Sequence, residues 1–257
     1  MPVLTSADGT RIAYQSGGRG PALVLVDGAL CHRSSGPLAA LLERDFTVYA
    51  YDRRGRGESG DTAPFAVDRE IEDLRAVVAA AGGRAAVHGI SSGAALVLRA
   101  AAVEPGITRI SLYEPPFVAE AGRAAEAKEY SARLQELLSA GRRGDAVALF
   151  LAHVGVPAPA VAAMRGQPHW PAFEAIAPTL GYDDAVLADG FVPRDLARQV
   201  GVPALVLAGG ASPPELRAAA RAAAEALPDA VHRTLADQTH DVAAEALAPV
   251  LAEFFGG

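Results

Sequence analysis

Short apolar runs alternate with longer amphipathic patterns along most of the chain. Continuous apolar runs of this length are typical of strands buried on both faces of a parallel sheet. The segments between them have helical spacing, and several end at Gly or at Asp/Pro-rich stops. An antiparallel hairpin with an Asp-Gly turn is predicted to precede the sheet. The five compact apolar runs are residues 22–28, 46–52, 85–91, 109–116 and 204–210.

The alternation stops after Pro116 and resumes near residue 204. Residues 117–189 contain only helical or irregular segments, which we interpret as a helical cap inserted into the sheet domain. The sheet domain then comprises residues 1–116 and 190–257. Trp170 and Phe173 lie in the most aromatic part of the cap, and we expect them to contact substrate. Packing of the cap against the sheet domain is the alternative explanation for these two rings.

The length and net charge of the chain limit the number of domains and the kinds of partner that are expected. A chain of 257 residues fits one large α/β unit with a modest insertion. The net charge of −7 gives no electrostatic reason to expect nucleic acid or an anionic membrane surface as partner. Neither a signal peptide nor a membrane span is expected, and Cys31 is the only cysteine, so a cytoplasmic location is predicted. Lys128 is the only lysine, which suggests a GC-rich bacterial source. The oligomeric state is left open, with a homodimer as one option.

Two adjacent serines follow the apolar run 85–91, in Gly89-Ile90-Ser91-Ser92-Gly93. This G-x-S-x-G pattern between a buried strand and a helix is the setting of a nucleophile elbow. Glycines two residues before and after the serine let strand and helix approach closely, and that frame centres on Ser91. Ser92 is expected to contribute only its backbone N–H, to an oxyanion hole. A Ser/Gly-rich turn that caps a helix is the structural alternative.

A second glycine-rich stretch, GRGESG at residues 55–60, has the G-x-G-x-x-G pattern of dinucleotide-binding proteins. In that fingerprint the last glycine opens a helix, and an acid about 20 residues later binds the ribose. Here Pro64 precedes any helix, and the next apolar run ends without an acid. We interpret the stretch as a loop that packs beside the active site. None of the usual metal-ligand spacings is present, so neither an organic cofactor nor a metal is expected.

The chain resembles the α/β-hydrolase family along nearly its whole length. The resemblance implies an α/β-hydrolase fold, in which helices flank a mostly parallel, eight-stranded sheet with a cap. It also implies a catalytic triad in the chain order Ser, acid, His, with His240 at the position of the family's base. The motifs that carry the resemblance are VDGAL (26–30), YDRRGRGESG (51–60), GISSGAA (89–95) and LADQTHDV (235–242).

The oxyanion loop departs from the commonest family pattern, which has His-Gly where this chain has Asp27-Gly28. A carboxylate aimed at a developing oxyanion would oppose catalysis. We therefore expect the Asp27 side chain to turn away and bind loop amides, Arg53 or Arg54. The backbone N–H of Gly28 or Ala29 would still face the pocket.

The acid of the triad is harder to assign, because most of the family has it after the seventh strand. There the first carboxylate is Glu215, and residues 212–215 (Ser-Pro-Pro-Glu) fit a helix capping box. Asp237 and Asp241 flank His240, and Asp241 is better explained as a helix N-cap.

Glu114 is the preferred acid, with Glu215 as the alternative. It follows an apolar strand, 23 residues after Ser91, at the sheet edge where catalytic groups gather. A glutamate at that position needs a partner such as an imidazole N–H, because burying it unpaired is costly. Some members of the family that this chain resembles, haloalkane dehalogenases and zearalenone-type lactonases among them, have their acid at this position. Two other polar residues have structural explanations: His88 is expected to pack in a strand, and Cys31 to be buried or line the pocket.

These residues predict a serine hydrolase of carboxylic esters, including lactones, that forms an acyl-enzyme. The motifs VDGAL, GISSGAA, SLYEPPF and GGASPPE most resemble zearalenone-type lactonases, which implies a macrolactone substrate, and a generic esterase fits equally. The expected partner is thus a small-molecule ester or lactone. A cofactor-free perhydrolase or haloperoxidase-like enzyme and a non-catalytic small-molecule-binding relative remain as alternatives.

Overall fold

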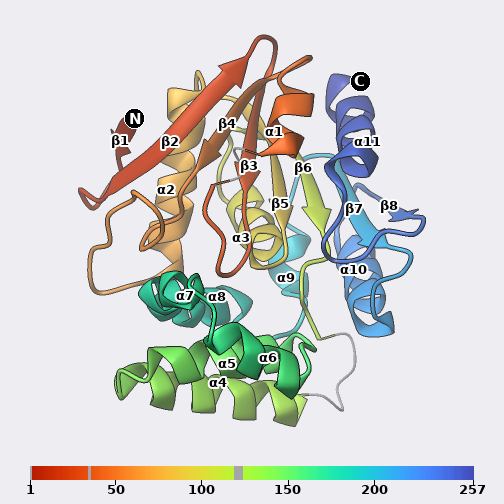
Figure 1. The fold of residues 1–257 in the computed structure, drawn as a ribbon. Coiled ribbons are helices and arrows are strands. Elements are labelled where there is room, and N and C mark those ends of the chain that lie inside the picture. The colour runs from red at the N-terminus through yellow and green to blue at the C-terminus, as the bar shows by residue number, and fades with distance from the viewer. Residues whose placement is uncertain (1, 34–35, 119–123) are drawn as a thin grey trace.

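The computed structural model describes residues 2–33, 36–118 and 124–257. These residues form an eight-stranded sheet with helices packed on both of its faces (Figure 1). The strand order across the sheet is β1-β2-β4-β3-β5-β6-β7-β8. In chain order, the strands are β1 (Val3–Thr5), β2 (Arg11–Gly18), β3 (Ala22–Val26), β4 (Thr47–Tyr51), β5 (Ala85–Ile90), β6 (Ile107–Tyr113), β7 (Ala204–Gly209) and β8 (Ala230–Leu235).

The pairing of the strands confirms the predicted mostly parallel sheet. β1 pairs with β2, and β2 with β4, in antiparallel orientation, whereas each neighbouring pair from β4 across to β8 is parallel. The β1–β2 pair is the expected hairpin, with Asp8 and Gly9 in its turn. Parallel strands need long crossover connections, which helices commonly supply. The helices of the sheet domain are α1 (Pro37–Leu42), α2 (Val67–Ala80), α3 (Ser92–Ala101), α9 (Arg194–Ala197), α10 (Pro214–Ala226) and α11 (Ala244–Gly256).

The sheet separates two apolar clusters, one on each face. Successive side chains of a strand point to opposite faces, and β3 illustrates this. Val24 and Val26 belong to the cluster formed with α2, α3 and α10, whereas Leu23 and Leu25 belong to the cluster formed with α1 and α11. All four residues are at most 1% exposed. Burial of each such side chain stabilises the folded state by about 1.5–3 kcal/mol. The well-packed core therefore holds the ends of the strands in fixed positions.

A group of helices lies beyond the end of the sheet at which β5 and β6 finish (Figure 1). We call this group of helices the cap, because they fall within the predicted cap segment, residues 117–189, and they have two apolar clusters of their own, around Trp170 and around Leu134. Leu30, in the loop after β3, packs against both clusters, so the cap rests on that loop. The cap helices are α4 (Ala124–Ser139), α5 (Arg143–His153), α6 (Ala158–Arg165), α7 (Trp170–Ile176), the 3-10 helix η2 (Ala177–Thr179) and α8 (Leu180–Leu187).

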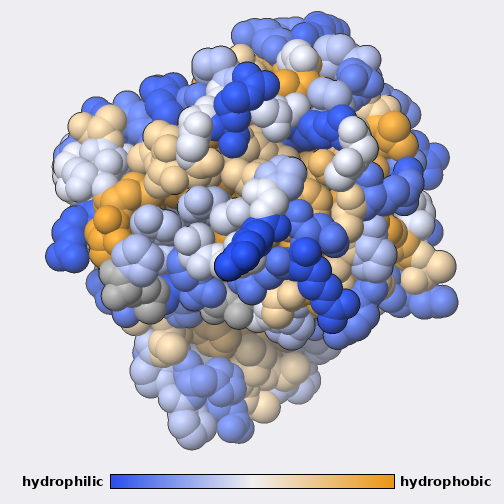
Figure 2. Space-filling model, turned by 90° about the horizontal axis from the view of Figure 1, so that it is seen from above, coloured by the Kyte–Doolittle hydropathy of each residue, from blue (hydrophilic) through white to orange (hydrophobic). Residues whose placement is uncertain are grey.

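The surface carries a mixture of polar and apolar residues. Figure 2 shows the molecule from above, where hydrophilic residues are spread among smaller apolar areas. None of the helices in the described ranges is long and apolar enough to cross a membrane. The cytoplasmic location stays a prediction.

Candidate active site

Ser91 lies in the sharp turn between β5 and α3. Its backbone has φ 57° and ψ −128°, a combination that an L-residue adopts only under strain. The turn is held because the Ser91 N–H donates a 2.9 Å hydrogen bond to the carbonyl of Tyr113 in β6. Ser91 is partly exposed, whereas Ser92 is buried. This geometry is that of a nucleophile elbow, and it gives the two serines different environments.

Three glycines allow the chain to pass close to Ser91. A Cβ atom on Gly89 would lie 2.6 Å from the carbonyl oxygen of Gly93, and one on Gly93 would lie 2.4 Å from that of Val26. A Cβ atom on Gly28 would lie 2.9 Å from the Cβ of Ser91. Real Cβ atoms do not approach their neighbours so closely, which explains why glycine is required. The loop after β3 therefore runs directly against the Ser91 turn.

Glu114 and His240 are joined at the same edge of the sheet. Glu114 follows β6 directly and is fully buried. Its Oε2 lies 2.7 Å from Nδ1 of His240, and its Oε1 accepts a 2.7 Å hydrogen bond from the Gly209 N–H. Burial alone would raise the pKa of Glu114, but interactions with His240, Ser212 and the Gly209 amide outweigh burial and hold the pKa below its usual value. An ionised carboxylate therefore faces the imidazole.

His240 is presented by the loop between β8 and α11. The Tyr113 hydroxyl donates a 2.5 Å hydrogen bond to the carbonyl of Thr239, which ties this loop to the end of β6. The His240 side chain is 40% exposed. Because Nδ1 is hydrogen-bonded to Glu114, Nε2 is the ring nitrogen that can exchange a proton with a nucleophile or substrate.

The predicted capping box at the start of α10 is wrong. The helix begins at Pro214 and has no side-chain cap. The N–H of Ser212 bonds instead to the carbonyl of Gly209, at 3.2 Å, so this buried serine stays at the sheet edge beside Glu114. Glu215, the alternative acid, lies exposed in the first turn of α10. The structure thus pairs His240 with the glutamate after β6 and leaves Glu215 at the surface.

The prediction that Asp241 caps the last helix is also wrong. α11 begins at Ala244, and the residue at its N-cap position is Ala243. The Ala243 N–H bonds to the side-chain oxygen of Gln238 at 3.0 Å. Gln238 therefore satisfies a backbone donor at the helix start, and the helix begins later than an Asp241 cap would require.

Two buried arginines hold carbonyl groups of the loop after β3. Arg53 donates a 3.3 Å hydrogen bond to the Asp27 carbonyl, and Arg56 donates one to the Gly28 carbonyl. Among the described contacts, Arg53 therefore reaches the backbone of Asp27 instead of its carboxylate, and binding of that carboxylate to loop amides stays a prediction. Arg54 forms its ion pairs elsewhere, with carboxylates of α2 and of the β1–β2 turn. The GRGESG loop, which contains Arg56, does pack beside the site as expected.

Asp183, a buried carboxylate on α8 of the cap, was not predicted from the sequence. Its Oδ1 accepts a 2.7 Å hydrogen bond from the Ser92 hydroxyl and 2.8 Å hydrogen bonds from Arg53 and Arg56. The expectation that Ser92 uses only its amide is therefore wrong, because its hydroxyl is tied to the cap. Three arginines between residues 53 and 56 did indicate that carboxylate partners were needed, but no local pattern pointed to Asp183.

Trp170 and Phe173, the predicted substrate contacts, belong to one apolar cluster of the cap. Trp170 is 5% exposed, and its indole N–H donates a 3.1 Å hydrogen bond to Glu174. The two rings meet edge to face, with centroids 6.3 Å apart. Leu30 joins the same cluster from the loop after β3. Packing therefore accounts for Trp170, and contact with substrate stays a prediction for both rings.

The prediction for His88 is confirmed, whereas the one for Cys31 is wrong in part. His88 is 2% exposed, with Nδ1 lying 3.2 Å from the Ser111 hydroxyl, and burial lowers its pKa to about 4. It is the packed strand residue that was predicted, and the lowered pKa keeps it neutral near pH 7. Cys31 is exposed, so burial, the first of its two predicted settings, is wrong, and lining of the pocket stays a prediction. Protein atoms around the thiol nevertheless raise its pKa to about 11, with a further contribution from Asp27, and a protonated thiol is a poor nucleophile.

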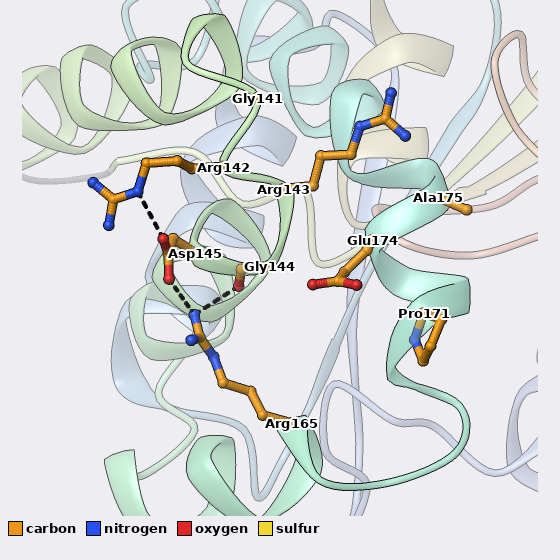
Figure 3. Close-up of a pocket in the computed structure, with 9 residues that line it drawn as sticks. All are labelled: Gly141, Arg142, Arg143, Gly144, Asp145, Arg165, Pro171, Glu174 and Ala175. Carbon is orange, nitrogen blue, oxygen red and sulfur yellow. Dashed lines mark hydrogen bonds and ion pairs between the residues drawn. The ribbon is translucent and has the colours of Figure 1, made fainter.

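A surface hollow of about 620 Å³ lies in the cap, between the α4–α5 turn and helices α6 and α7 (Figure 3). Its charges are largely paired with one another, since Asp145 accepts hydrogen bonds from both Arg142 and Arg165. None of its lining residues belongs to the group around Ser91, Glu114 and His240. Within the described ranges, no three His, Cys, Asp or Glu side chains are arranged to hold a metal ion. The absence of a cofactor remains an expectation.

Comparisons with known proteins agree with the fold. A sequence model of the alpha/beta hydrolase family matches residues 20–253, and the chain belongs to this family. The crystal structure of an alpha/beta hydrolase from Sphaerobacter thermophilus is similar, with 49% identity, a TM-score of 0.89 and coverage of 99% of this chain and 100% of that chain. The enol-lactonase from Burkholderia xenovorans has a TM-score of 0.68 at 23% identity, over 100% of both chains.

A curated relative is similar over a shorter region. A non-heme haloperoxidase from Rhodococcus erythropolis is 36% identical over 103 residues. The match covers 38% of this chain and 38% of that protein. It therefore supports common ancestry over part of the chain, and the activity of that enzyme enters below only as a proposal.

Proposed function

We propose that this protein hydrolyses carboxylic esters or lactones through an acyl-enzyme, with Ser91 as nucleophile, His240 as base and Glu114 as the acid that orients it. The observation that carries the proposal is the 2.7 Å hydrogen bond between Glu114 and His240. β5 and β6 pair in register at Ile90 and Tyr113, so Glu114 follows β6 where Ser91 follows β5. A strained serine and a carboxylate-bound imidazole at one sheet edge are the components of acyl transfer.

The proposed reaction has two halves. The Ser91 Oγ bonds to the carbonyl carbon while Nε2 of His240 takes its proton. The tetrahedral oxyanion is stabilised by the N–H of Ser92 and by that of Gly28 or Ala29. The C–O bond to the leaving alcohol then breaks, and the alcohol takes the proton from His240. In a lactone that alcohol stays attached to the acyl group, because the ring opens.

Water completes the second half. His240 takes a proton from the water as its oxygen attacks the acyl-enzyme, and the released Ser91 oxygen takes that proton back. Glu114 stays ionised throughout and stabilises the imidazolium, which agrees with the lowered pKa of this carboxyl. Neither half needs a metal or an organic cofactor.

Within this substrate class, resemblance to the zearalenone-type lactonases implies a macrolactone, and a generic ester fits equally. The cap helices beyond Ser91 would enclose the acyl or ring part of the substrate, with Trp170 and Phe173 as contacts. The similarity to the enol-lactonase supports the fold alone at 23% identity. A hydrolysis screen of simple esters and of lactones of increasing ring size tests this choice directly.

The decisive experiment compares the native enzyme with Ser91→Ala on p-nitrophenyl acetate and on the best lactone. Turnover that disappears in Ser91→Ala supports the proposal. Absence of turnover on every ester and lactone, together with tight binding of a small molecule, would assign the protein to a non-catalytic relative instead.

A perhydrolase or haloperoxidase-like activity is the second candidate, favoured by the partial match to a non-heme haloperoxidase. Here hydrogen peroxide replaces water as the attacking group on the acyl-enzyme. The product is a peracid, which then oxidises bromide outside the site. Peroxide- and carboxylate-dependent bromination of monochlorodimedone, lost in Ser91→Ala, would support this candidate over plain hydrolysis.

A further inference from the structure

Asp183 links the cap to the groups around Ser91. It lies on α8 and is 4% exposed. One of its oxygens, Oδ1, accepts hydrogen bonds from the Ser92 hydroxyl, Arg53 and Arg56 at 2.7–2.8 Å. Ser92 is the first residue of α3, and both arginines follow β4. A single cap carboxylate therefore gathers three donors from the sheet domain.

The same two arginines reach onward to the candidate oxyanion loop. Arg56 donates through Nη2 to Asp183 and through Nη1 to the Gly28 carbonyl. Arg53 donates through Nη1 to the Asp27 carbonyl at 3.3 Å, while Glu70 holds the rest of its guanidinium with hydrogen bonds of 2.6 and 2.7 Å. Two successive carbonyls of the loop are thus fixed by side chains that the cap carboxylate positions.

Fixing the Gly28 carbonyl also fixes the direction of the next N–H. A trans peptide is planar, so its C=O and N–H point in opposite directions. Because the Gly28 carbonyl points at Arg56, the Ala29 N–H points away from Arg56. A Cβ on Gly28 would lie 2.9 Å from the Cβ of Ser91, so this peptide lies against the nucleophile turn. Rotation of the peptide would redirect the Ala29 donor.

Charge explains why Asp183 controls this arrangement. Arg56 is 1% exposed, and among its described contacts Asp183 supplies the carboxylate. Arg53 differs, because it also has Glu70. The charges of Arg56 and Arg53 together hold the pKa of Asp183 below its usual value although burial opposes this, so the carboxylate is ionised. Without that carboxylate, the buried Arg56 cation would be left with a carbonyl alone, which favours its movement toward water.

We infer that Asp183 is a positioning residue that couples seating of the cap to assembly of the oxyanion hole. Through Arg56 it holds the Gly28–Ala29 peptide, and through Ser92 it holds the first turn of α3. Donors on both sides of the tetrahedral oxyanion are then in place only when α8 is seated. This inference rests on the proposed function, since it assigns an oxyanion hole to that reaction.

The test compares Asp183→Asn with Asp184→Asn. Asp184 is the neighbouring carboxylate on α8, and it accepts a 2.6 Å hydrogen bond from Ser131 within the cap. Functional sites are counted with a fluorophosphonate, so that kcat is expressed per intact site. Affinity for a boronic acid, which forms a tetrahedral adduct with the serine, reports on the oxyanion hole separately from KM.

Asp183→Asn is expected to lower kcat per site by roughly 10²-fold, the effect of losing one oxyanion donor, with KM changed by less than about threefold. Boronate affinity should fall in the same proportion, and Asp184→Asn should change neither quantity. A lower Tm and fewer titratable sites, with kcat per site and boronate affinity unchanged, would show that Asp183 only fastens the cap.

A second variant keeps the test valid if Asp183→Asn does not fold. Arg56→Gln removes the buried cation together with the link to Gly28, and it should give the same loss of kcat and boronate affinity. Retained kcat in Arg56→Gln would overturn the inference. Failure of the proposed function is distinguishable, because then Ser91→Ala itself would keep the activity.

Discussion

A hydrogen bond of 2.7 Å joins Oε2 of Glu114 to Nδ1 of His240, although 126 positions separate the two residues. Glu114 has a φ of 44°, so the chain turns sharply where β6 ends. The Gly209 N–H, at the end of β7, holds the other carboxylate oxygen at 2.7 Å. The carboxylate follows β6 and is held by the end of β7, so the imidazole that is hydrogen-bonded to it has one preferred orientation.

Glu114→Gln should lower kcat by about 10⁴, because an amide in place of the carboxylate favours the wrong imidazole tautomer. Steady-state ester hydrolysis measures the loss, and circular dichroism checks that the fold is kept. Glu215→Gln is the matched control, since Glu215 is exposed in the first turn of α10. The assignment of the acid would be wrong if the activities of these two variants were reversed.

A comparison of Ser91→Ala with Ser92→Ala should distinguish loss of the nucleophile from loss of a hydrogen bond to the cap. Loss of a triad nucleophile costs up to about six orders of magnitude in kcat, which is the expectation for Ser91→Ala. Ser92→Ala keeps its amide but removes the donor to Asp183 at 2.7 Å, so a loss of about 1–3 kcal/mol in unfolding free energy is expected. Its kcat should fall less than tenfold. A dead Ser92→Ala enzyme with an active Ser91→Ala enzyme would place the elbow one residue later.

Trp170→Ala should destabilise the cap by about 3–5 kcal/mol, because the ring is 5% exposed inside an apolar cluster. If the ring also contacts substrate, the ratio of kcat/KM between bulky and small esters should change as well. Thermal unfolding and a two-ester comparison measure the two effects. An equal loss on both esters with a lowered Tm would leave Trp170 with a packing role only.

His88 should make the fold sensitive to mild acid. Burial lowers its pKa to about 4 in the folded chain, whereas the unfolded chain binds a proton near pH 6.5. Between these values the unfolded state binds more protons, so stability is lost as pH falls from 6.5 toward 4. The full loss is on the order of 3 kcal/mol. Urea unfolding of native protein and His88→Gln at pH 7.5 and 4.5 tests this, and parallel pH dependences would contradict it.

The sequence alone determined the features that depend on neighbours along the chain. The apolar runs predicted the buried strands, because strands covered on both faces need continuous apolar residues. The glycine spacing around Ser91 predicted the turn, because glycines at 89 and 93 are required where strand and helix meet. The pairing of Glu114 could also be predicted from the sequence, because a carboxylate that ends a buried strand needs a partner.

Only the tertiary structure decided which distant groups meet. The Ser92–Asp183 and Arg53–Asp183 hydrogen bonds join residues 91 and 130 positions apart. Ser212 and Asp241 matched helix-cap patterns, yet backbone contacts of Gly209 and the side chain of Gln238 moved the helix starts past them. Such contacts depend on sheet order and on how α8 packs, and a hydrogen bond between distant side chains leaves no periodic pattern in the sequence.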